Sequence, residues 1–304
     1  MYSNKTLIYK CYTRHLPVPG KHLAVEPRPF DPDTPPPPGG FTVKNEYLSF
    51  DTYQRGQMRL PDDHGTYSLP WREGKPAVVT TLSTVLKSDR PMFKPGDKVS
   101  AMADAGRAGR RSAPLSGVQV GPRHRAGNSH RRPRHIWALI IHQLFRVRTK
   151  AARWQGHLHL SGQRRRRSNR RPVGQDARMK VIGSTGSDEK VDFVVRELGY
   201  DGAWNYKKET TADSLDRLAP EGLDVYYDNV GGEQLETTLL RMKDYGTIVA
   251  SGMASQYNLP DEEKYGVKTL MHIVFKRLTI HGFVCSDPQH LEKYLPSFSN
   301  DMAT

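Results

Sequence analysis

Residues 180–190, KVIGSTGSDEK, are the stretch that decides the fold. Residues 180–183 are typical of a short buried strand, and a turn of small residues follows them. Ser187 is placed to cap a helix, and the two acids after it suit the positive end of a helix dipole. Apolar side chains then recur at helical spacing as far as Leu198, and Gly199 is placed to end the helix. The stretch predicts a strand, a tight turn and a helix.

The same alternation continues toward the C-terminus. Residues 223–227 (LDVYY) and 247–250 (TIVA) are strand-like. Between them, a second helix is marked by Leu235, Leu239 and Met242. Strand, helix, strand, helix, strand predicts an α/β fold with a parallel, doubly wound sheet of the Rossmann kind.

The N-terminal third has a different pattern. Residues 1–105 mix short apolar runs with Pro and Gly. PPPPGG at 35–40 predicts a stiff turn before a strand-like run at 41–44, and Pro-Gly-Asp at 95–97 leads into another strand. These residues predict a small, mostly β domain.

The positive charge of the chain is concentrated in one segment. The net charge of +14 suggests a nucleic-acid-binding protein. However, residues 106–178 hold 18 Arg and one Lys against a single acid, Asp176, so the rest of the chain carries a net charge of about −4. An Arg-rich nucleic-acid-binding protein is therefore kept as an alternative, and nucleic acid is not the expected partner.

Residues 106–179 fit neither pattern, and a shifted reading frame would explain them. A doubly wound sheet should begin with a strand and a Gly-rich turn about 20 residues before residue 180. Residues 158–167 there read LHLSGQRRRR.

An Arg codon of the CGN type, read one base later, encodes Gly, Ala, Val, Asp or Glu, and a shifted His codon often encodes Ile. Synonymous codons chosen for residues 151–179 can be read in that frame as PRGGKDIFISAASGAVGQIVGQLAKMPG, a strand, a small-residue loop and a helix. The alternative is a genuine basic insertion that binds RNA or DNA.

Cysteine and histidine usage argues against metal chemistry. Two cysteines, Cys11 and Cys285, can form neither a disulfide framework nor a four-thiolate zinc site. The twelve histidines show no catalytic zinc pattern, and six of them lie in residues 106–179. The sequence has no apolar run near the roughly 18–20 residues of a membrane span, and no signal-peptide core at its start. We expect a cytoplasmic protein without a membrane partner.

Several stretches together resemble one known family. They are 50–58 (FDTYQRGQM), 94–97 (KPGD), 183–190 (GSTGSDEK), 205–207 (NYK), 227–232 (YDNVGG) and 252–258 (GMASQYN). They are similar to leukotriene hydroxydehydrogenase/prostaglandin reductase and to plant and fungal alkenal double-bond reductases. These are zinc-independent medium-chain dehydrogenases/reductases. The resemblance covers roughly residues 5–103 and 180–300.

The resemblance implies a domain arrangement. It implies a GroES-like catalytic domain at 1–105 and an NADP-binding Rossmann domain at 180–304, with the active site in the cleft between them. The aberrant Arg-rich segment 106–179 would replace the start of the Rossmann domain. The family also continues with a helix and strands beyond the position of Thr304. Because the phosphate-cradling loop is absent, we expect the chain as printed to bind NADPH poorly or not at all, and to be catalytically impaired.

The resemblance also implies the reaction. The family's enzymes reduce the carbon–carbon double bond of α,β-unsaturated aldehydes or ketones with NADPH, so the expected partner is a small enone or alkenal. A quinone reductase is the alternative within the same superfamily. A homodimer is left open.

The expected cofactor site starts at the strand that ends near Thr185. An NAD enzyme usually has an acid at the end of this strand, which accepts from the ribose 2′-hydroxyl. Here hydroxyl groups stand there, with Lys190 one helical turn on, and this favours the 2′-phosphate of NADPH. By resemblance, Tyr206 is a second phosphate contact, and Phe283 with Val284 belongs to a loop over the nicotinamide. The expected cofactor-binding residues are Gly183, Ser184, Thr185, Lys190, Tyr206, Asn229, Gly252, Phe283 and Val284.

Two tyrosines are the expected catalytic residues. By resemblance, Tyr257 places its phenol near the substrate carbonyl or the nicotinamide ribose. Hydride addition to the β-carbon of an enone builds negative charge on the carbonyl oxygen, which a phenol O–H can stabilise. Tyr53 resembles a wall of the substrate pocket in the same family. The alternative for both tyrosines is a residue that only packs. Asn229 could instead lie in a simple turn, and Lys190 could be a solvated side chain.

Overall fold

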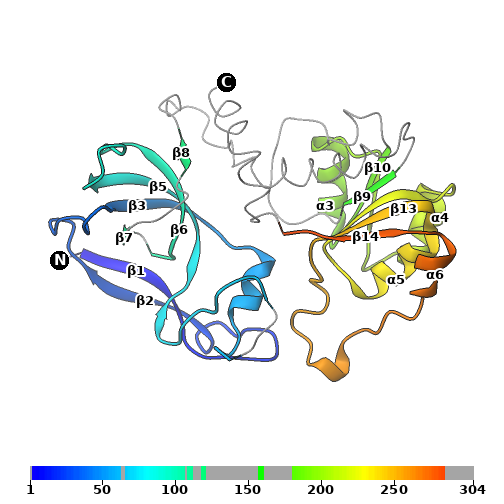
Figure 1. Ribbon diagram of the computed structural model, residues 1–304, viewed down its shortest axis with the longest axis horizontal. Helices are drawn as coiled ribbons and strands as arrows, with labels where there is room; N and C mark the ends of the chain where they lie inside the picture. The colour runs from blue at the N-terminus through cyan, green and yellow to red at the C-terminus, as the bar shows by residue number, and fades with distance from the viewer. Residues whose placement is uncertain are drawn as a thin grey trace. The chain divides into compact units, whose positions relative to one another are not determined.

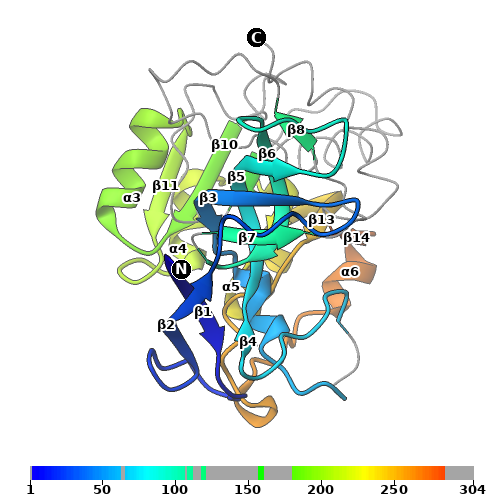
Figure 2. The ribbon, with the colours of Figure 1, turned by 90° about the vertical axis from the view of Figure 1, so that its left-hand side faces the viewer.

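The computed structural model describes residues 2–62, 66–106, 108–111, 118–120, 157–160 and 180–284, which form two compact units (Figures 1 and 2). The first unit contains the described residues up to 120 together with Tyr257–Pro260. The second contains the described residues of 157–256 and 261–284. A short piece of the C-terminal half therefore belongs to the N-terminal unit.

The first unit is built from two antiparallel sheets, which confirms the mostly β prediction. One sheet has the order β2-β1-β4, and the other the order β7-β3-β5-β6-β8. Figure 2 shows β3 beside β7 and β5. The strands are β1 (Tyr2–Tyr9), β2 (Leu23–Phe30), β3 (Phe41–Ser49), β4 (Lys75–Pro76), β5 (Val78–Ser88), β6 (Lys98–Asp104), β7 (Ala108–Arg111) and β8 (Val118–Val120).

Alternation and turn chemistry explain these strands. Along β5, every second side chain from Val79 to Val85 is buried, as a strand with one face on a core requires. The predicted turns precede β3 and β6, and they contain Gly39 at φ 62° and Gly96 at φ 94°. Only glycine adopts this left-handed region without strain. The strand predictions at 41–44 and after residue 97 are confirmed.

The second unit contains a six-stranded parallel sheet with the order β11-β10-β9-β12-β13-β14. Its strands are β9 (His157–Leu160), β10 (Lys180–Thr185), β11 (Gly202–Asn205), β12 (Leu223–Asp228), β13 (Met242–Ala250) and β14 (Thr279–Gly282). The strand order runs outward from β9 in both directions, so the topological switch point lies between β9 and β12. Ligands of open α/β sheets bind at the carboxyl ends of the strands at such a point. The predicted doubly wound sheet is confirmed.

Helices connect these strands. They are α3 (Asp188–Asp192), which a π-helical turn η2 (Phe193–Glu197) continues, α4 (Thr211–Leu218), α5 (Gly232–Arg241) and α6 (Met271–Phe275), with a 3-10 turn η3 at Asp261–Glu263. Gly199 follows with φ 73°, so the predicted helix end is confirmed. The side chain of Ser187 makes no capping hydrogen bond, although the residue occupies the predicted N-cap position.

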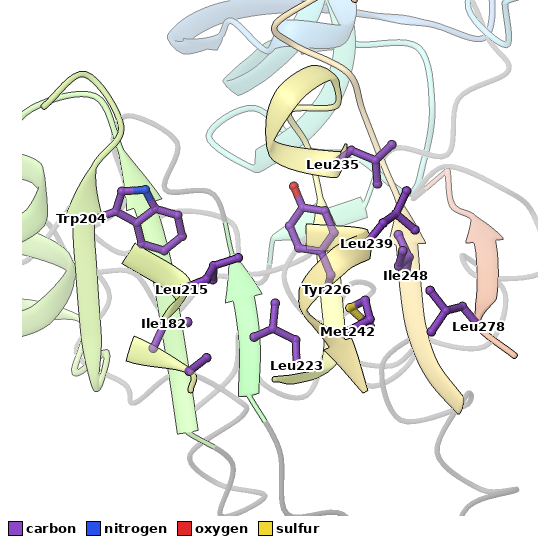
Figure 3. Packing of buried hydrophobic residues seen from close by; sticks show 11 residues of the cluster. Ile182, Trp204, Leu215, Leu223, Tyr226, Leu235, Leu239, Met242, Ile248 and Leu278 are labelled. Carbon is purple, nitrogen blue, oxygen red and sulfur yellow. The ribbon is translucent and has the colours of Figure 1, made fainter. Parts of the chain in front are cut away.

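The core of the second unit lies between its sheet and its helices (Figure 3). Ile182, Leu215 and Leu239 are completely buried there. Full burial of such a side chain contributes roughly 1.5–3 kcal/mol. Met242 is also in this core, but the prediction that it marks the second helix was wrong. Its backbone is extended, with φ −66° and ψ 144°, because α5 ends at Arg241 and β13 begins at Met242.

A strand occupies the place where the sequence lacks the expected Gly-rich start of the sheet. In β9, Leu158 pairs with Val181 of β10 and with Val225 of β12. The expected strand position, about 20 residues before Lys180, is therefore confirmed. The loop and helix of the shifted frame, residues 161–179, lie outside the described residues.

Among the residues that the structure describes, no helix is both long and apolar enough to cross a membrane.

Candidate cofactor-binding and catalytic site

The end of β10 carries the predicted residues Gly183, Ser184 and Thr185, all of which are buried. The Ser184 hydroxyl donates to Oε1 of Gln234 in α5 at 3.1 Å. The Thr185 hydroxyl donates to the backbone carbonyl of Ser187, also at 3.1 Å. These hydroxyls therefore tie the strand to α5 and shape the following turn. Their predicted contact with a phosphate stays a prediction.

Lys190 and Tyr206 lie on the two segments that border this turn. Lys190 is in the first turn of α3 and has no ion-pair partner among the described residues. The Tyr206 amide donates to the Thr185 carbonyl at 3.0 Å. A Cβ atom at Gly186 would lie 2.9 Å from the Tyr206 hydroxyl oxygen, so the glycine lets the phenol approach the turn. The fold thus brings a phenol to the turn that leads into the helix carrying Lys190.

The first acid after β10, Asp188, is already bound within the protein. Its carboxylate accepts from Nδ2 of Asn205 at 2.7 Å and forms an ion pair with Lys208. The hydrogen bonds from Asn205 and Lys208 hold the pKa of Asp188 below its ordinary value. This carboxylate therefore binds side chains of the protein, whereas the acid at this place in an NAD enzyme accepts from the ribose 2′-hydroxyl.

The turn between β12 and α5 is organised around the buried carboxylate of Asp228. Its Oδ1 accepts from the Tyr226 hydroxyl and from the backbone N–H groups of Val230 and Gly231, each at 2.8 Å. Oδ2 is buried and has no hydrogen-bond partner among the described residues. Burial together with the Asp228 charge raises the pKa of Tyr226, so this phenol stays protonated and donates. Asp228 therefore sets the backbone around the predicted cofactor contact Asn229.

The loop after β13 is joined to this turn by backbone hydrogen bonds. The Gly252 amide donates to the Asp228 carbonyl at 3.1 Å, and the Ala254 amide donates to the Asn229 carbonyl at 2.9 Å. Gly232 has φ 59°, and a Cβ there would lie 2.6 Å from Nε2 of Gln256. The glycine leaves room for Gln256, and the backbone hydrogen bonds place the predicted residues Asn229 and Gly252 on two adjoining loops.

The last predicted cofactor residues, Phe283 and Val284, follow β14. The Phe283 amide donates to the Ala250 carbonyl at 2.9 Å, and its buried ring packs edge-on against Tyr227, with ring centroids 6.4 Å apart. Val284 is half-buried. The Phe283 ring thus packs against Tyr227 of β12, and the predicted contact of Phe283 and Val284 with nicotinamide stays a prediction.

The two predicted catalytic tyrosines belong to the first unit. Tyr53 lies in the 3-10 helix η1 (Thr52–Gln57), is half-buried, and has its hydroxyl 4.0 Å from the sulfur of Met102. Tyr257 is half-buried in the four-residue piece Tyr257–Pro260. Residues more than 200 positions apart therefore fold into one unit.

Sequence reasoning missed two residues that organise the site. Asp228 lies inside the quoted YDNVGG stretch, and an acid at the end of a buried strand is a usable signal. Arg55 lies inside FDTYQRGQM, but its partner Asn258 is distant in sequence, at 2.9 Å from its Nε in the structure. No local pattern could have indicated that pair.

Removing the Asp228 carboxylate should destabilise the second unit. We expect Asp228→Ala to lower the free energy of unfolding by about 2 kcal/mol, because the Tyr226 hydroxyl and two backbone N–H groups lose their buried acceptor. Asp228→Asn keeps an oxygen acceptor and should cost less than about 1 kcal/mol. Urea titration measures both values, and equal losses would contradict this account.

The same residue predicts a pH dependence. Burial raises the pKa of Asp228, although hydrogen bonds from Gly231, Val230 and Tyr226 oppose the rise. An acid whose pKa is higher in the folded state than its unfolded value of about 3.9 opposes folding once it ionises. The free energy of unfolding should therefore decline as the pH rises from about 4 through the raised pKa. The decline should be smaller in Asp228→Asn.

Family models match both parts of the chain. Residues 31–109 match the N-terminal domain of oxidoreductases, and residues 175–300 match a family described as zinc-binding dehydrogenase. Among the described residues, no group of three or more His, Cys, Asp or Glu side chains could hold a metal ion. These residues do not fit a zinc centre, in spite of the family's description.

Known proteins and solved structures similar to this chain are oxidoreductases or NADPH-binding proteins. The NADP-dependent oxidoreductase RED1 of Cochliobolus heterostrophus is 38% identical over 304 residues, which cover 97% of this chain and 84% of that protein. The NADP-dependent 2-alkenal reductase of Nicotiana tabacum is 34% identical over 276 residues, 83% of this chain and 73% of that protein. The crystal structure of CurA in complex with NADPH from Vibrio vulnificus has a TM-score of 0.76 at 21% identity and covers 98% of this chain and 87% of that one.

The fold and the site define a two-domain oxidoreductase with a GroES-like β domain and a doubly wound Rossmann domain, as predicted. The chain belongs to the medium-chain dehydrogenase/reductase family, in its zinc-independent, NADP-dependent branch.

Proposed function

We propose that this protein reduces the carbon–carbon double bond of α,β-unsaturated aldehydes or ketones, with NADPH as the hydride donor. The observation that carries the proposal is the turn after β10. The strand ends in Thr185, the acid Asp188 is engaged by Lys208 and Asn205, and Lys190 has no ion-pair partner among the described residues. A turn that offers an ammonium, and whose first acid is engaged by other side chains of the protein, suits a 2′-phosphate.

The residues of the chain have distinct parts in this proposal. Lys190 and Tyr206 would bind the 2′-phosphate, and Asn229 and Gly252 would hold the nicotinamide half on the two loops that Asp228 joins. Bound NADPH supplies the hydride that the β-carbon of the substrate receives. The Tyr257 phenol would donate a hydrogen bond to the carbonyl oxygen, where negative charge develops, and Tyr53 would line the substrate pocket. The substrate class is supported by the tobacco 2-alkenal reductase among the relatives.

An assay with matched acceptors tests the function. The purified full chain, and a frame-repaired version that carries the shifted-frame residues in place of residues 151–179, are each given NADPH together with an alkenal, an enone or a quinone, and NADPH oxidation is followed. We expect oxidation with the alkenal or the enone to exceed that with the quinone. Oxidation with the quinone alone would favour a quinone reductase. Steeply salt-sensitive oligonucleotide binding without any NADPH oxidation would favour the Arg-rich alternative.

We further propose that residues 106–179 are the start of the Rossmann domain read in a shifted frame. The central position of β9 supports this, since the shifted frame reads Ile-Phe-Ile-Ser at residues 157–160 and a small-residue loop after it. Translation of the genomic locus in three frames, and sequencing of the transcript, test it. If another frame encodes the strand, loop and helix, a version carrying those residues should bind NADPH at least roughly 10-fold more tightly than the printed chain. Frames without such a segment would dismiss the proposal.

A further inference from the structure

One arginine of the N-terminal unit binds three separate segments of that unit. Arg55, in η1, donates from Nη2 to the carbonyls of Thr13 at 2.7 Å and His15 at 3.2 Å. Its Nε donates to Oδ1 of Asn258 at 2.9 Å. Its Nη1 lies 3.5 Å from the carbonyl of Met58, at the end of the same helix. The guanidinium therefore links the helix, an N-terminal loop and the piece Tyr257–Pro260.

The chemistry of this arginine is unusual for a surface side chain. Arg55 is half-buried, and burial lowers its pKa, although a guanidinium remains charged at any ordinary pH. All the acceptors named above are neutral, and no carboxylate forms an ion pair with it among the described residues. The rigid, planar fork fixes the direction of each hydrogen bond. The surrounding segments are therefore held by directed hydrogen bonds from the guanidinium and not by charge pairing.

The segment that Arg55 holds includes a predicted catalytic residue. Tyr257–Pro260 leaves the second unit after Gln256 and returns to it at Asp261. A side-chain hydrogen bond at Asn258 restrains the backbone of a residue whose Cα is about 3.8 Å from that of Tyr257. Tyr53, the other predicted catalytic tyrosine, precedes Arg55 by two residues in the same short helix.

We propose that Arg55 is a positioning residue, which acts through Asn258 to place the Tyr257 phenol where it donates a hydrogen bond to the substrate carbonyl oxygen. This inference rests on the proposed function, because Tyr257 matters to an enone reductase. Arg55 itself touches neither substrate nor cofactor in the proposal. The hydrogen bond between Arg55 and Asn258 is therefore a specific requirement for the chemical step.

A double-mutant cycle in the frame-repaired version, in which kcat can be measured, tests the inference. Arg55→Lys keeps the charge but loses the fork, and Asn258→Ala removes the acceptor. We expect each to lower kcat for enone reduction by roughly 10- to 30-fold, since a misplaced catalytic group costs up to about 100-fold. The Kd of NADPH should stay within about 2-fold, because Arg55 does not act on the cofactor. In a Tyr257→Phe background, neither substitution should lower kcat further.

Two further variants separate positioning from a structural role. Asn258→Asp keeps an oxygen acceptor and should restore most of the activity that Asn258→Ala loses. Arg59→Lys is the matched control, because Arg59 lies in the same unit and donates to the carbonyls of Gly56 at 2.8 Å and Ser68 at 2.6 Å. It should change kcat by less than about 3-fold, as expected for a substitution away from the reacting groups.

Hydrogen–deuterium exchange supplies a measurement that needs no activity. Arg55→Lys should speed exchange in Tyr257–Pro260, and Arg59→Lys should not. Unchanged exchange, or losses of kcat that add to the loss in Tyr257→Phe, would overturn the inference while the enone reductase assignment stands. If neither the unaltered chain nor the frame-repaired version oxidises NADPH with an enone, the proposed function fails and the inference falls with it. Exchange alone then decides whether Arg55 restrains the segment.

Discussion

Tyr257→Phe should lower kcat for enone reduction by roughly 100- to 1,000-fold, because it removes one hydrogen-bond donor from the oxygen on which charge develops. That loss corresponds to about 2.7–4 kcal/mol of transition-state stabilisation. The ring keeps its size, so the Kd of NADPH should change by less than about 2-fold. Steady-state kinetics with an alkenal, together with NADPH binding measured by fluorescence, provide both numbers.

The control for this experiment removes a phenol oxygen elsewhere in the same unit. Tyr47 lies in β3 with 53% of its surface exposed. Tyr47→Phe should leave kcat within about 2-fold of the wild type, as exposed substitutions usually do. If Tyr257→Phe kept wild-type kcat, the phenol would have no part in the reaction, and Tyr257 would be a packing residue.

In the frame-repaired version, Lys190→Ala should weaken NADPH binding by roughly 50- to 100-fold, because an ammonium that contacts a phosphate makes a charge-assisted hydrogen bond. NADH has no 2′-phosphate, so its Kd should change by less than about 3-fold. The weakening for NADPH should also shrink as the salt concentration rises, since exposed charges are screened. Calorimetric titration with both nucleotides measures the difference.

Lys180 provides the matched control at the other end of the same strand. It is the exposed first residue of β10, whereas the predicted phosphate site follows the last residue of that strand. Lys180→Ala removes the same charge and should leave both dissociation constants within about 2-fold of the wild type. Equal weakening of NADPH and NADH in Lys190→Ala would refute the 2′-phosphate role.

The strands and helices of the second unit could be predicted because their signals are local. The burial pattern of β10, the glycine after η2 and the apolar face of α5 each depend on residues within a few turns of one another. Met242 shows the limit of such signals. Its apolar side chain belongs to the core in either conformation, so periodicity could not show that the helix ends one residue earlier.

The sequence predicted which segments form the candidate site. It did not predict which side chains of those segments contact one another. The quoted stretches indicated the carboxyl ends of β10, β12 and β13, where ligands of parallel sheets bind. They did not indicate that the Ser184 hydroxyl donates to Gln234, 50 residues further along the chain, instead of facing a ligand. The choice between an inward and an outward hydroxyl depends on which helix packs beside the strand.

The sequence by itself determined the fold class, the hydroxyl-bearing turn with Lys190 after β10 and the NADP-dependent family. Each follows from short runs whose residue types constrain their own backbone. Only the tertiary structure decided that β9 lies between β10 and β12, that Asp228 binds the turn beside Asn229, and that Arg55 holds Asn258. The β9 pairing and the Arg55–Asn258 bond join residues that meet only after the chain has folded back on itself. The Asp228 contacts are local, but a hydrogen bond forms only where donor and acceptor come within about 3 Å of each other, and burial of the strand decides that the carboxylate turns toward these donors.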